Sequence, residues 1–179
     1  VDDDGDGVND LAIGAYALSM AGDTVGAAWI ATSGHLSSAP SELAVSGQAP
    51  SSVSPLVDSS GQYFVHGRVH NEQFGRSVAL VPALSSDGRA GLMVGSPLGK
   101  VSGTELTGGA QIYEFIINYG LNEVPRASFG GESWMVDGRL GEQVSAGVLA
   151  GVPHAVVGGY RADGRSVDSG AAYVLPLSP

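Results

Sequence analysis

Short apolar runs recur along the chain and are separated by polar, glycine-rich stretches. Three of these runs contain an apolar triplet followed by glycine, and they lie at residues 10–16, 91–97 and 154–160. Each is followed by a second run that starts with glycine and alanine, at residues 26–30, 109–113 and 170–174. No stretch keeps the helical period over three turns, whereas short runs bounded by glycine are typical of β-strands. The pattern therefore predicts an all-β chain of short strands.

The order of these runs predicts a repeating unit of four antiparallel strands. A related strand precedes the glycine pattern at residues 74–78 and 140–144, and one more strand is expected at residues 62–65 and 126–129. Repeated units of four short strands are the signature of β-propeller blades. The predicted fold is therefore a partial ring of four-stranded blades.

We expect this partial propeller to form one domain over residues 1–179, with units at about 1–67, 73–131 and 140–179. The first unit contains a long insertion at residues 34–60, which is rich in Ser, Pro, Ala and Gly and lacks periodicity. Such a composition predicts a surface loop between two strands. The sequence leaves open whether this loop binds a partner or has no binding role.

Composition and charge narrow the possible functions. The 179 residues include 28 glycines and only 15% charged residues, which suits strands joined by tight turns. A net charge of −10 disfavours nucleic acid as a partner and favours cations. The absence of cysteine excludes disulfides, zinc–thiolate sites and cysteine nucleophiles. The longest apolar stretch, residues 144–160, is too interrupted to cross a membrane.

Residues 2–10 carry the strongest chemical motif, D-x-D-x-D-G-x-x-D. Carboxylates at alternate positions of one tight loop repel one another unless a cation lies between them. A hard cation that takes many oxygen ligands resolves this repulsion, and Ca²⁺ fits better than Mg²⁺. We therefore predict one structural calcium site. Its ligands are the carboxylates of Asp2, Asp4, Asp6 and Asp10 and the carbonyl oxygen of Val8.

The motif departs from an EF-hand after its first half. Ile13 occupies the twelfth loop position, where an EF-hand needs a bidentate Glu followed by a helix. The apolar run at residues 11–15 predicts a strand, so a calcium switch is not expected. The shorter third loop, residues 147–154, has no carboxylate, and we expect no metal there or in the second unit. The equivalent ligand positions of that second unit hold Ala83, Ser85, Asp87 and Gly91.

Together these motifs resemble the FG-GAP repeat of integrin α-chain heads. The second unit carries them as Phe74-Gly75-Arg76-Ser77-Val78, then Leu92-Met93-Val94-Gly95-Ser96-Pro97, then Gly109-Ala110-Gln111-Ile112-Tyr113. The resemblance implies a propeller braced by calcium loops on one face, with ligand contacts on the opposite face. That face would carry the loops around residues 16–25, 67–73, 98–108, 131–139 and 161–168. The exposed candidates for ligand binding are Trp134, Tyr160 and Arg161.

The implied function is a calcium-binding module, extracellular or at the cell surface, that adheres to a protein or glycan. Calcium loops of low affinity fill only where calcium is abundant, which favours that location. Further blades or the rest of a longer parent chain are expected partners; nucleic acid and membrane insertion are not. The alternative is a non-catalytic accessory propeller of a secreted enzyme, since FG-GAP repeats resemble those of glycosylphosphatidylinositol-specific phospholipase D.

Catalysis by this chain itself is not expected. It has no G-x-S-x-G nucleophile motif. His66 and His70 are four residues apart but lack the Glu of a zincin. The sequence therefore predicts a binding module and not an enzyme.

Overall fold

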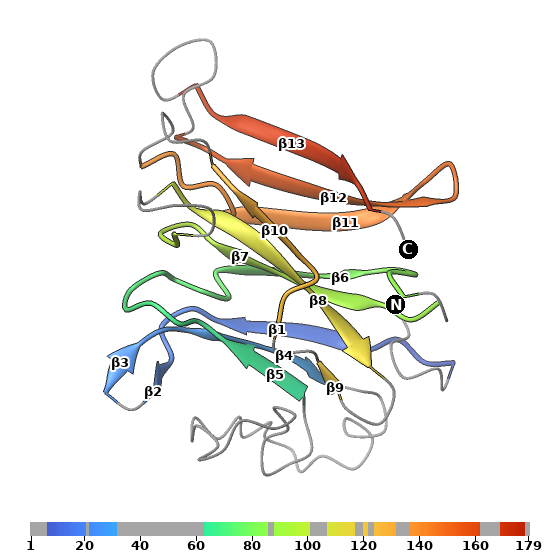
Figure 1. Ribbon diagram of the computed structural model, residues 1–179, viewed down its shortest axis with the longest axis horizontal. Helices are drawn as coiled ribbons and strands as arrows, with labels where there is room; N and C mark the ends of the chain where they lie inside the picture. The colour runs from blue at the N-terminus through green and yellow to red at the C-terminus, as the bar shows by residue number, and fades with distance from the viewer. Residues whose placement is uncertain are drawn as a thin grey trace.

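The computed structural model describes residues 7–20, 22–31, 63–85, 88–100, 107–116, 120–121, 124–131, 137–161 and 169–177. The regular structure of these residues consists of strands, arranged in three antiparallel sheets and one two-stranded ribbon (Figure 1). The prediction of an all-β fold of antiparallel strands is confirmed. Within the described part of the chain no sheet closes on itself.

Strands that are neighbours in a sheet follow one another along the chain. Sheet 1 consists of β1 (Leu11–Ala15), β4 (Ala27–Ala31) and β5 (Tyr63–His66). Sheet 2 consists of β6 (Ser77–Val81), β7 (Gly91–Ser96), β8 (Gly109–Ile116) and β10 (Ala127–Gly130), with β9 (Gly120–Leu121) paired to β8. Sheet 3 consists of β11 (Gln143–Leu149), β12 (Val152–Gly159) and β13 (Ala171–Pro176). A ribbon of β2 (Ser19–Met20) and β3 (Asp23–Thr24) lies between β1 and β4.

The second and third strands of each unit lie where the sequence repeat predicted them, whereas the first strands, β6 and β11, begin three residues later than the expected ranges 74–78 and 140–144. The triplet-and-glycine runs form β1, β7 and β12, and the following small-residue runs form β4, β8 and β13. Sheet 2 contains all four expected strands of a unit. Among the described residues, sheet 1 starts at the second strand of the pattern and sheet 3 ends at the third.

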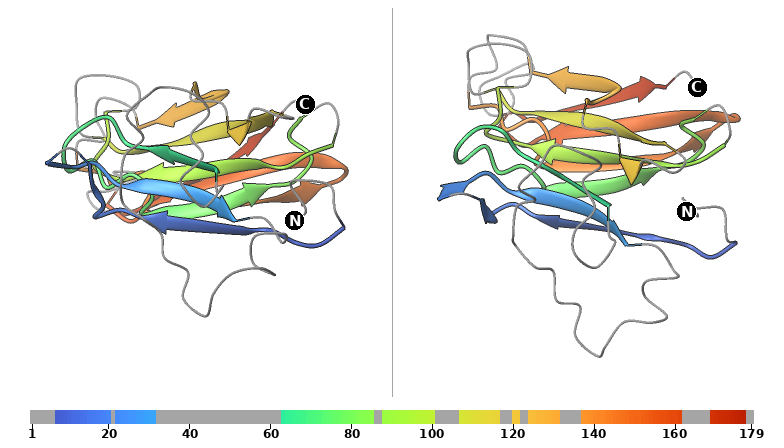
Figure 2. Two further views of the ribbon diagram at one scale, coloured as in Figure 1. Left: turned by 90° about the horizontal axis from the view of Figure 1, so that it is seen from below. Right: turned by 60° about the horizontal axis from the view of Figure 1, so that its bottom comes forward.

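The three sheets form successive layers (Figures 1 and 2), and β6 contacts both β1 of sheet 1 and β11 of sheet 3. Side chains of β7 contribute to the interfaces of sheet 2 with both sheet 1 and sheet 3. Leu92 and Val94 pack in the cluster shared with sheet 1, whereas Met93 packs in the cluster shared with sheet 3. Because successive side chains of a strand point to opposite faces, sheet 2 is covered on both sides. Every residue of β7 is accordingly buried.

Sheet 3 is packed differently, because its described contacts cover one face. Ala155 and Val157 of β12 are buried against sheet 2. The alternate residues of β12 and β13 are more exposed, and the side chain of Val174 is 60% exposed. This alternation leaves an outward face on sheet 3.

Pairs of glycines bring the sheets into close contact. A Cβ atom added to Gly14 of β1 would lie 2.2 Å from the carbonyl oxygen of Gly75, which precedes β6. A Cβ atom added to Gly95 of β7 would lie 2.1 Å from the carbonyl oxygen of Gly141, which precedes β11. The two interfaces therefore repeat the same contact, one unit apart, and any side chain at these positions would push the sheets apart.

The repeat has a different register at β8 from the one expected. Gly26, Gly108 and Gly170 each precede a third strand and adopt φ values of +79°, +74° and +74°. Gly108, and not Gly109, is thus the equivalent of Gly26, and the alignment predicted at residues 109–113 is wrong by one residue. Two adjacent glycines fit the motif equally well, and only the backbone conformation separates them. The strand pairing agrees, with equivalent pairs Gly14–Ala28, Gly95–Ala110 and Gly158–Ala172.

Candidate functional site

The aspartate-rich segment leads directly into β1. Of the predicted calcium ligands, Val8 and Asp10 lie in the described part of the chain, and Asp2, Asp4 and Asp6 lie outside it. Asp10 immediately precedes β1 and is only 8% exposed, although its neighbourhood is open, since Val8 is 56% exposed. Burial of a carboxylate is costly unless hydrogen bonds or a cation compensate its charge.

Gly7 gives the segment its turn. Its φ of +87° lies in the left-handed region that favours glycine. Within the described ranges, no three His, Cys, Asp or Glu side chains come together as a metal-binding group. Most of the predicted ligands fall outside those ranges, so the calcium site stays a prediction.

The equivalent loop of sheet 2 is held by hydrogen bonds from its own residues. The Ser85 hydroxyl accepts a 2.9 Å bond from the amide of Arg89 and donates a 3.3 Å bond to its carbonyl. The amide of Leu84 donates to the same carbonyl at 2.8 Å. The buried Leu84 side chain fills the space beside Gly91, and Asp87 lies outside the described residues.

In sheet 3 the expected third loop is wrong. Residues 147–154 pair across β11 and β12 and leave only Ala150 and Gly151 as the turn. Both turn residues have positive φ, +50° and +79°, as two-residue hairpins favour because this geometry matches the twist of the strands. His154 is a strand residue, and its Nδ1 lies 2.8 Å from the carbonyl oxygen of Val152.

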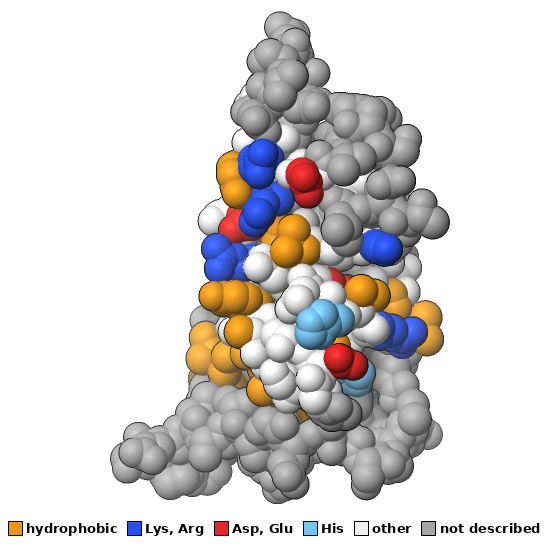
Figure 3. Space-filling view, turned by 90° about the vertical axis from the view of Figure 1, so that its left-hand side faces the viewer, with side chains coloured by type: hydrophobic (Ala, Val, Ile, Leu, Met, Phe, Trp, Pro, Cys, Tyr) orange, Lys and Arg blue, Asp and Glu red, His pale blue; other side chains and the backbone are white. Residues whose placement is uncertain are grey.

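These three connections lie at one end of the layered sheets, on the right in Figure 1. The opposite end carries the β2–β3 ribbon and the described parts of the other predicted loops. Figure 3 shows this end, where basic side chains gather with acidic and histidine side chains between them. The aspartate-rich segment and these basic and histidine side chains therefore lie at opposite ends of the layered sheets.

A polar pocket of about 220 Å³ lies at this second end, between β5 and β8. Its wall includes His66, Arg68 and Lys100, together with Gln111 and Tyr113. The Tyr113 hydroxyl donates a 2.6 Å hydrogen bond to the Gln111 side-chain oxygen. Burial raises the pKa of Tyr113 above its ordinary value, with a nearby Arg68 charge opposing the shift, so this hydroxyl stays neutral.

Glu72 fixes the turn that forms one side of this pocket. Its carboxylate is buried and accepts hydrogen bonds from the backbone amides of Arg68 and Val69. The Ser96 hydroxyl donates to the Glu72 carbonyl oxygen at 3.1 Å, which ties the turn to the end of β7. Glu72 is therefore a structural residue, and it lines the pocket together with the basic side chains of Arg68 and Lys100.

The predicted ligand-binding residues are partly placed. Tyr160 and Arg161 follow β12 directly and are exposed, Tyr160 by 56%. The Arg139 guanidinium lies 5.9 Å from the centre of the Tyr160 ring. Trp134 lies outside the described residues. These residues are not part of the polar pocket, so the structure describes two separate exposed features at this end.

A charged contact between units was not predicted from the sequence. Arg76 donates a 2.9 Å hydrogen bond from Nε to Glu142, and its guanidinium also lies 4.9 Å from the Tyr16 ring centre. The hydrogen bond and charge of Glu142, with a smaller contribution from Tyr16, raise the pKa of Arg76. Arg76 and Glu142 follow the equivalent glycines Gly75 and Gly141. Their opposite charges at equivalent positions are the feature of the sequence from which this contact could have been predicted.

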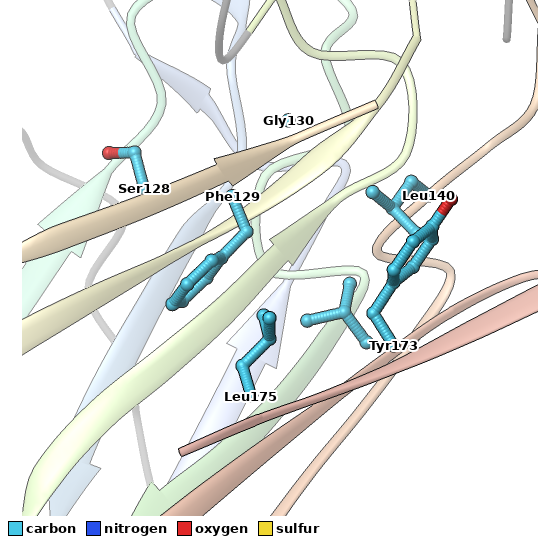
Figure 4. Close-up of a pocket in the computed structure, with 7 residues that line it drawn as sticks. Ser128, Phe129, Gly130, Leu140, Tyr173 and Leu175 are labelled. Carbon is cyan, nitrogen blue, oxygen red and sulfur yellow. The ribbon is translucent and has the colours of Figure 1, made fainter. Parts of the chain in front are cut away.

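A second, apolar cavity of about 370 Å³ lies between sheets 2 and 3 (Figure 4). Phe129 of β10 and Leu175 of β13 face each other across it. The equivalent interface between sheets 1 and 2 is filled by Phe74 and Tyr113, whose rings pack edge to face with centroids 6.1 Å apart. Counting from Gly141 and Gly170, the equivalents of these two rings are Leu140 and Leu175. The cavity therefore arises from two smaller side chains.

The double variant Leu140→Phe/Leu175→Tyr is expected to raise the free energy of unfolding by about 1 kcal/mol, because it fills this cavity as the other interface is filled. Denaturant unfolding followed by circular dichroism measures the change. Val174→Tyr is a matched control on the exposed side of the same strand and should have little effect. A double variant less stable than the parent would contradict the equivalence of the two interfaces.

No model of a known protein family matches the chain, and a search of curated proteins found no match. In the described residues, no helix is long and apolar enough to cross a membrane.

Proposed function

We propose that the chain is a calcium-binding extracellular or cell-surface β-propeller module of the FG-GAP type, which binds a protein or glycan and is not itself an enzyme. The observation that carries this proposal is the D-x-D-x-D-G-x-x-D segment ending in a buried Asp10 at the start of β1. The calcium ion is structural: it neutralises the clustered carboxylates and braces the connection that enters the sheet.

The arrangement of the sheets supports the propeller part of the proposal. Each sheet is an antiparallel meander whose strands pair in chain order, as in propeller blades. The same glycine contact occurs at both interfaces, Gly14 with Gly75 and Gly95 with Gly141. A repeated contact between successive units is the geometry by which identical blades would continue around a ring.

The ligand-binding part of the proposal is supported by the end opposite the aspartate segment. There His66, Arg68 and Lys100 line a pocket in a chain whose net charge is −10. The grouping of these side chains favours an anionic group of the ligand, such as an acidic side chain or an acidic sugar. Tyr160, Arg161 and Trp134 are proposed as additional contacts.

Calcium is expected to raise the thermal stability of the chain. A ligand that binds only the folded state stabilises it by about 2.7 kcal/mol when its concentration is 100 times Kd. Melting followed by circular dichroism, with calcium and then with chelator, measures this effect, and isothermal titration should give about one ion per chain.

Variants identify the ligands in this experiment. Asp4→Ala/Asp6→Ala should abolish the calcium-dependent shift, whereas Asp3→Ala, which changes an intervening position of the motif, should retain it. If the unchanged chain keeps a β-rich spectrum but shows no calcium response, the metal assignment is wrong.

A further inference from the structure

The apolar cavity between sheets 2 and 3 occupies the same place in the repeat as the polar pocket between sheets 1 and 2. Each lies between the fourth strand of one unit and the third strand of the next. These strands are β5 and β8 at the polar pocket and β10 and β13 at the apolar cavity. The glycines with positive φ before the third strands, Gly26, Gly108 and Gly170, allow the two walls to be compared position by position.

Three positions of the wall are equivalent in the two cavities and differ in polarity. The polar pocket has His66, Gln111 and Tyr113 at these positions, and the apolar cavity has Gly130, Tyr173 and Leu175. Among the described residues, the wall of the apolar cavity also has no basic side chain to match Arg68 and Lys100. The same place in the repeat therefore suits a neutral ligand here and an anionic group in the polar pocket.

The apolar cavity has a buried floor and a partly exposed rim. Leu140 and Val157 form the floor and are 3% and 0% exposed. The rim consists of half-buried side chains on β10 and β13, which are Phe129, Tyr173 and Leu175. Both strands lie at the edges of their sheets. A small molecule can therefore enter between these two edge strands.

Few polar groups line this cavity. The Ser128 side chain points away from it (Figure 4), because the adjacent Phe129 points inward. Gly130 contributes backbone atoms, and Tyr173 adds one hydroxyl to the wall. Apolar cavities exclude water and bind apolar molecules, and one of about 150 Å³ is large enough for benzene. At about 370 Å³, this cavity has room for an aromatic ring with its substituents.

The interface between sheets 1 and 2 indicates which apolar group fits. There the rings of Phe74 and Tyr113 pack edge to face, with centroids 6.1 Å apart. Two leucines at the equivalent positions leave the space of these rings unfilled at the other interface. The rings of Phe129 and Tyr173 remain in the wall and can contact a further ring by edge or face. An aromatic molecule is therefore favoured over an aliphatic one of the same size.

We propose that the cavity between sheets 2 and 3 is a binding site for a small, neutral aromatic molecule of one ring. The bound molecule supplies the ring that the other interface takes from the chain itself. This site goes beyond the proposed function, because it involves neither the aspartate segment nor the polar pocket.

Fluorine NMR with 4-fluorotoluene tests the proposal on the full chain. We expect saturable binding with a Kd of about 0.1–1 mM, which is in keeping with a ligand of so few atoms. The matched probe 4-fluorobenzoate has the same ring but carries a carboxylate. It should bind this cavity at least about tenfold more weakly, because burial of an unpaired charge is costly.

Variants locate the bound probe. Leu140→Phe/Leu175→Tyr should weaken the binding of 4-fluorotoluene by at least about tenfold, because the two rings fill the cavity. The same double variant is expected to be more stable than the parent, so unfolding does not explain such a loss. Leu175→Tyr alone, at a half-buried position, should weaken binding in the same direction. Val174→Tyr, on the exposed side of the same strand, should bind the probe as the parent does.

Two results would overturn the proposal. One is the same Kd for 4-fluorotoluene in the parent chain and in a Leu175→Tyr variant whose circular dichroism shows that it is folded. The other is no binding by the parent chain. If Trp134→Ala then binds the probe, the cavity belongs to the indole of the chain itself. Any binding of 4-fluorobenzoate to the polar pocket is separate, since Leu175→Tyr should leave it unchanged.

Discussion

Gly95→Ala is expected to lower the free energy of unfolding by about 3 kcal/mol, whereas Gly158→Ala, at the equivalent position of the next unit, leaves it unchanged or raises it by about 0.5 kcal/mol. The added Cβ of the first variant would lie 2.1 Å from the backbone oxygen of Gly141, so sheets 2 and 3 must separate to admit it. The second variant meets only ordinary contact, with its nearest atom at 3.8 Å.

Urea unfolding of the two variants beside the parent chain measures the difference. Because both variants make the same chemical change in equivalent strands, differences in strand propensity cancel. Equal stabilities of the two variants would show that the glycine contact does not hold the sheets together, and Gly14→Ala would then be unaffected as well.

Phe74→Ala is expected to cost about 3–5 kcal/mol, since the ring is 1% exposed and packs edge to face on Tyr113. A loss of this size is a large part of the stability of an ordinary domain. Thermal and denaturant unfolding followed by near- and far-ultraviolet circular dichroism would detect it.

Two comparisons sharpen this prediction. Phe74→Leu places at this interface the side chain found at Leu140 and should cost less, because leucine retains part of the buried area. Val174→Ala, on the outward face, should stay within about 0.5 kcal/mol of the parent. A similar cost at Phe74 and at Val174 would contradict the assignment of Phe74 to the interior.

The sequence predicted the strands well because the repeat contains each kind of strand more than once, so that equivalent runs can be aligned. A single short run such as residues 154–160 is ambiguous, but its alignment with two other runs fixes it as a strand. The register at Gly108 escaped prediction, since the neighbouring glycine fits the motif as well and the positive φ is a property of the folded backbone. The loop expected at residues 147–154 failed for a similar reason, because strand pairing continues to a two-residue turn.

The candidate sites were predictable to different degrees. The aspartate segment could be recognised as a candidate calcium site because all its predicted ligands are close in sequence. The pocket of His66, Arg68 and Lys100 could not, since β5 and the end of β7 are brought together only when sheets 1 and 2 pack. The Arg76–Glu142 pair likewise joins residues 66 positions apart. The two charges come close together only because the two units pack against each other.

The connection between the first two strands of a unit affects how the sequence of such a protein can evolve. It spans residues 82–90 in sheet 2 and only Ala150 and Gly151 in sheet 3, yet the glycine contact made by each unit is the same. The connections lie at one end of the layers, and Gly75 and Gly141 precede the strands at the other (Figure 1). The length of this connection can therefore change by insertion and deletion without altering the glycine contacts through which a unit packs on its neighbours.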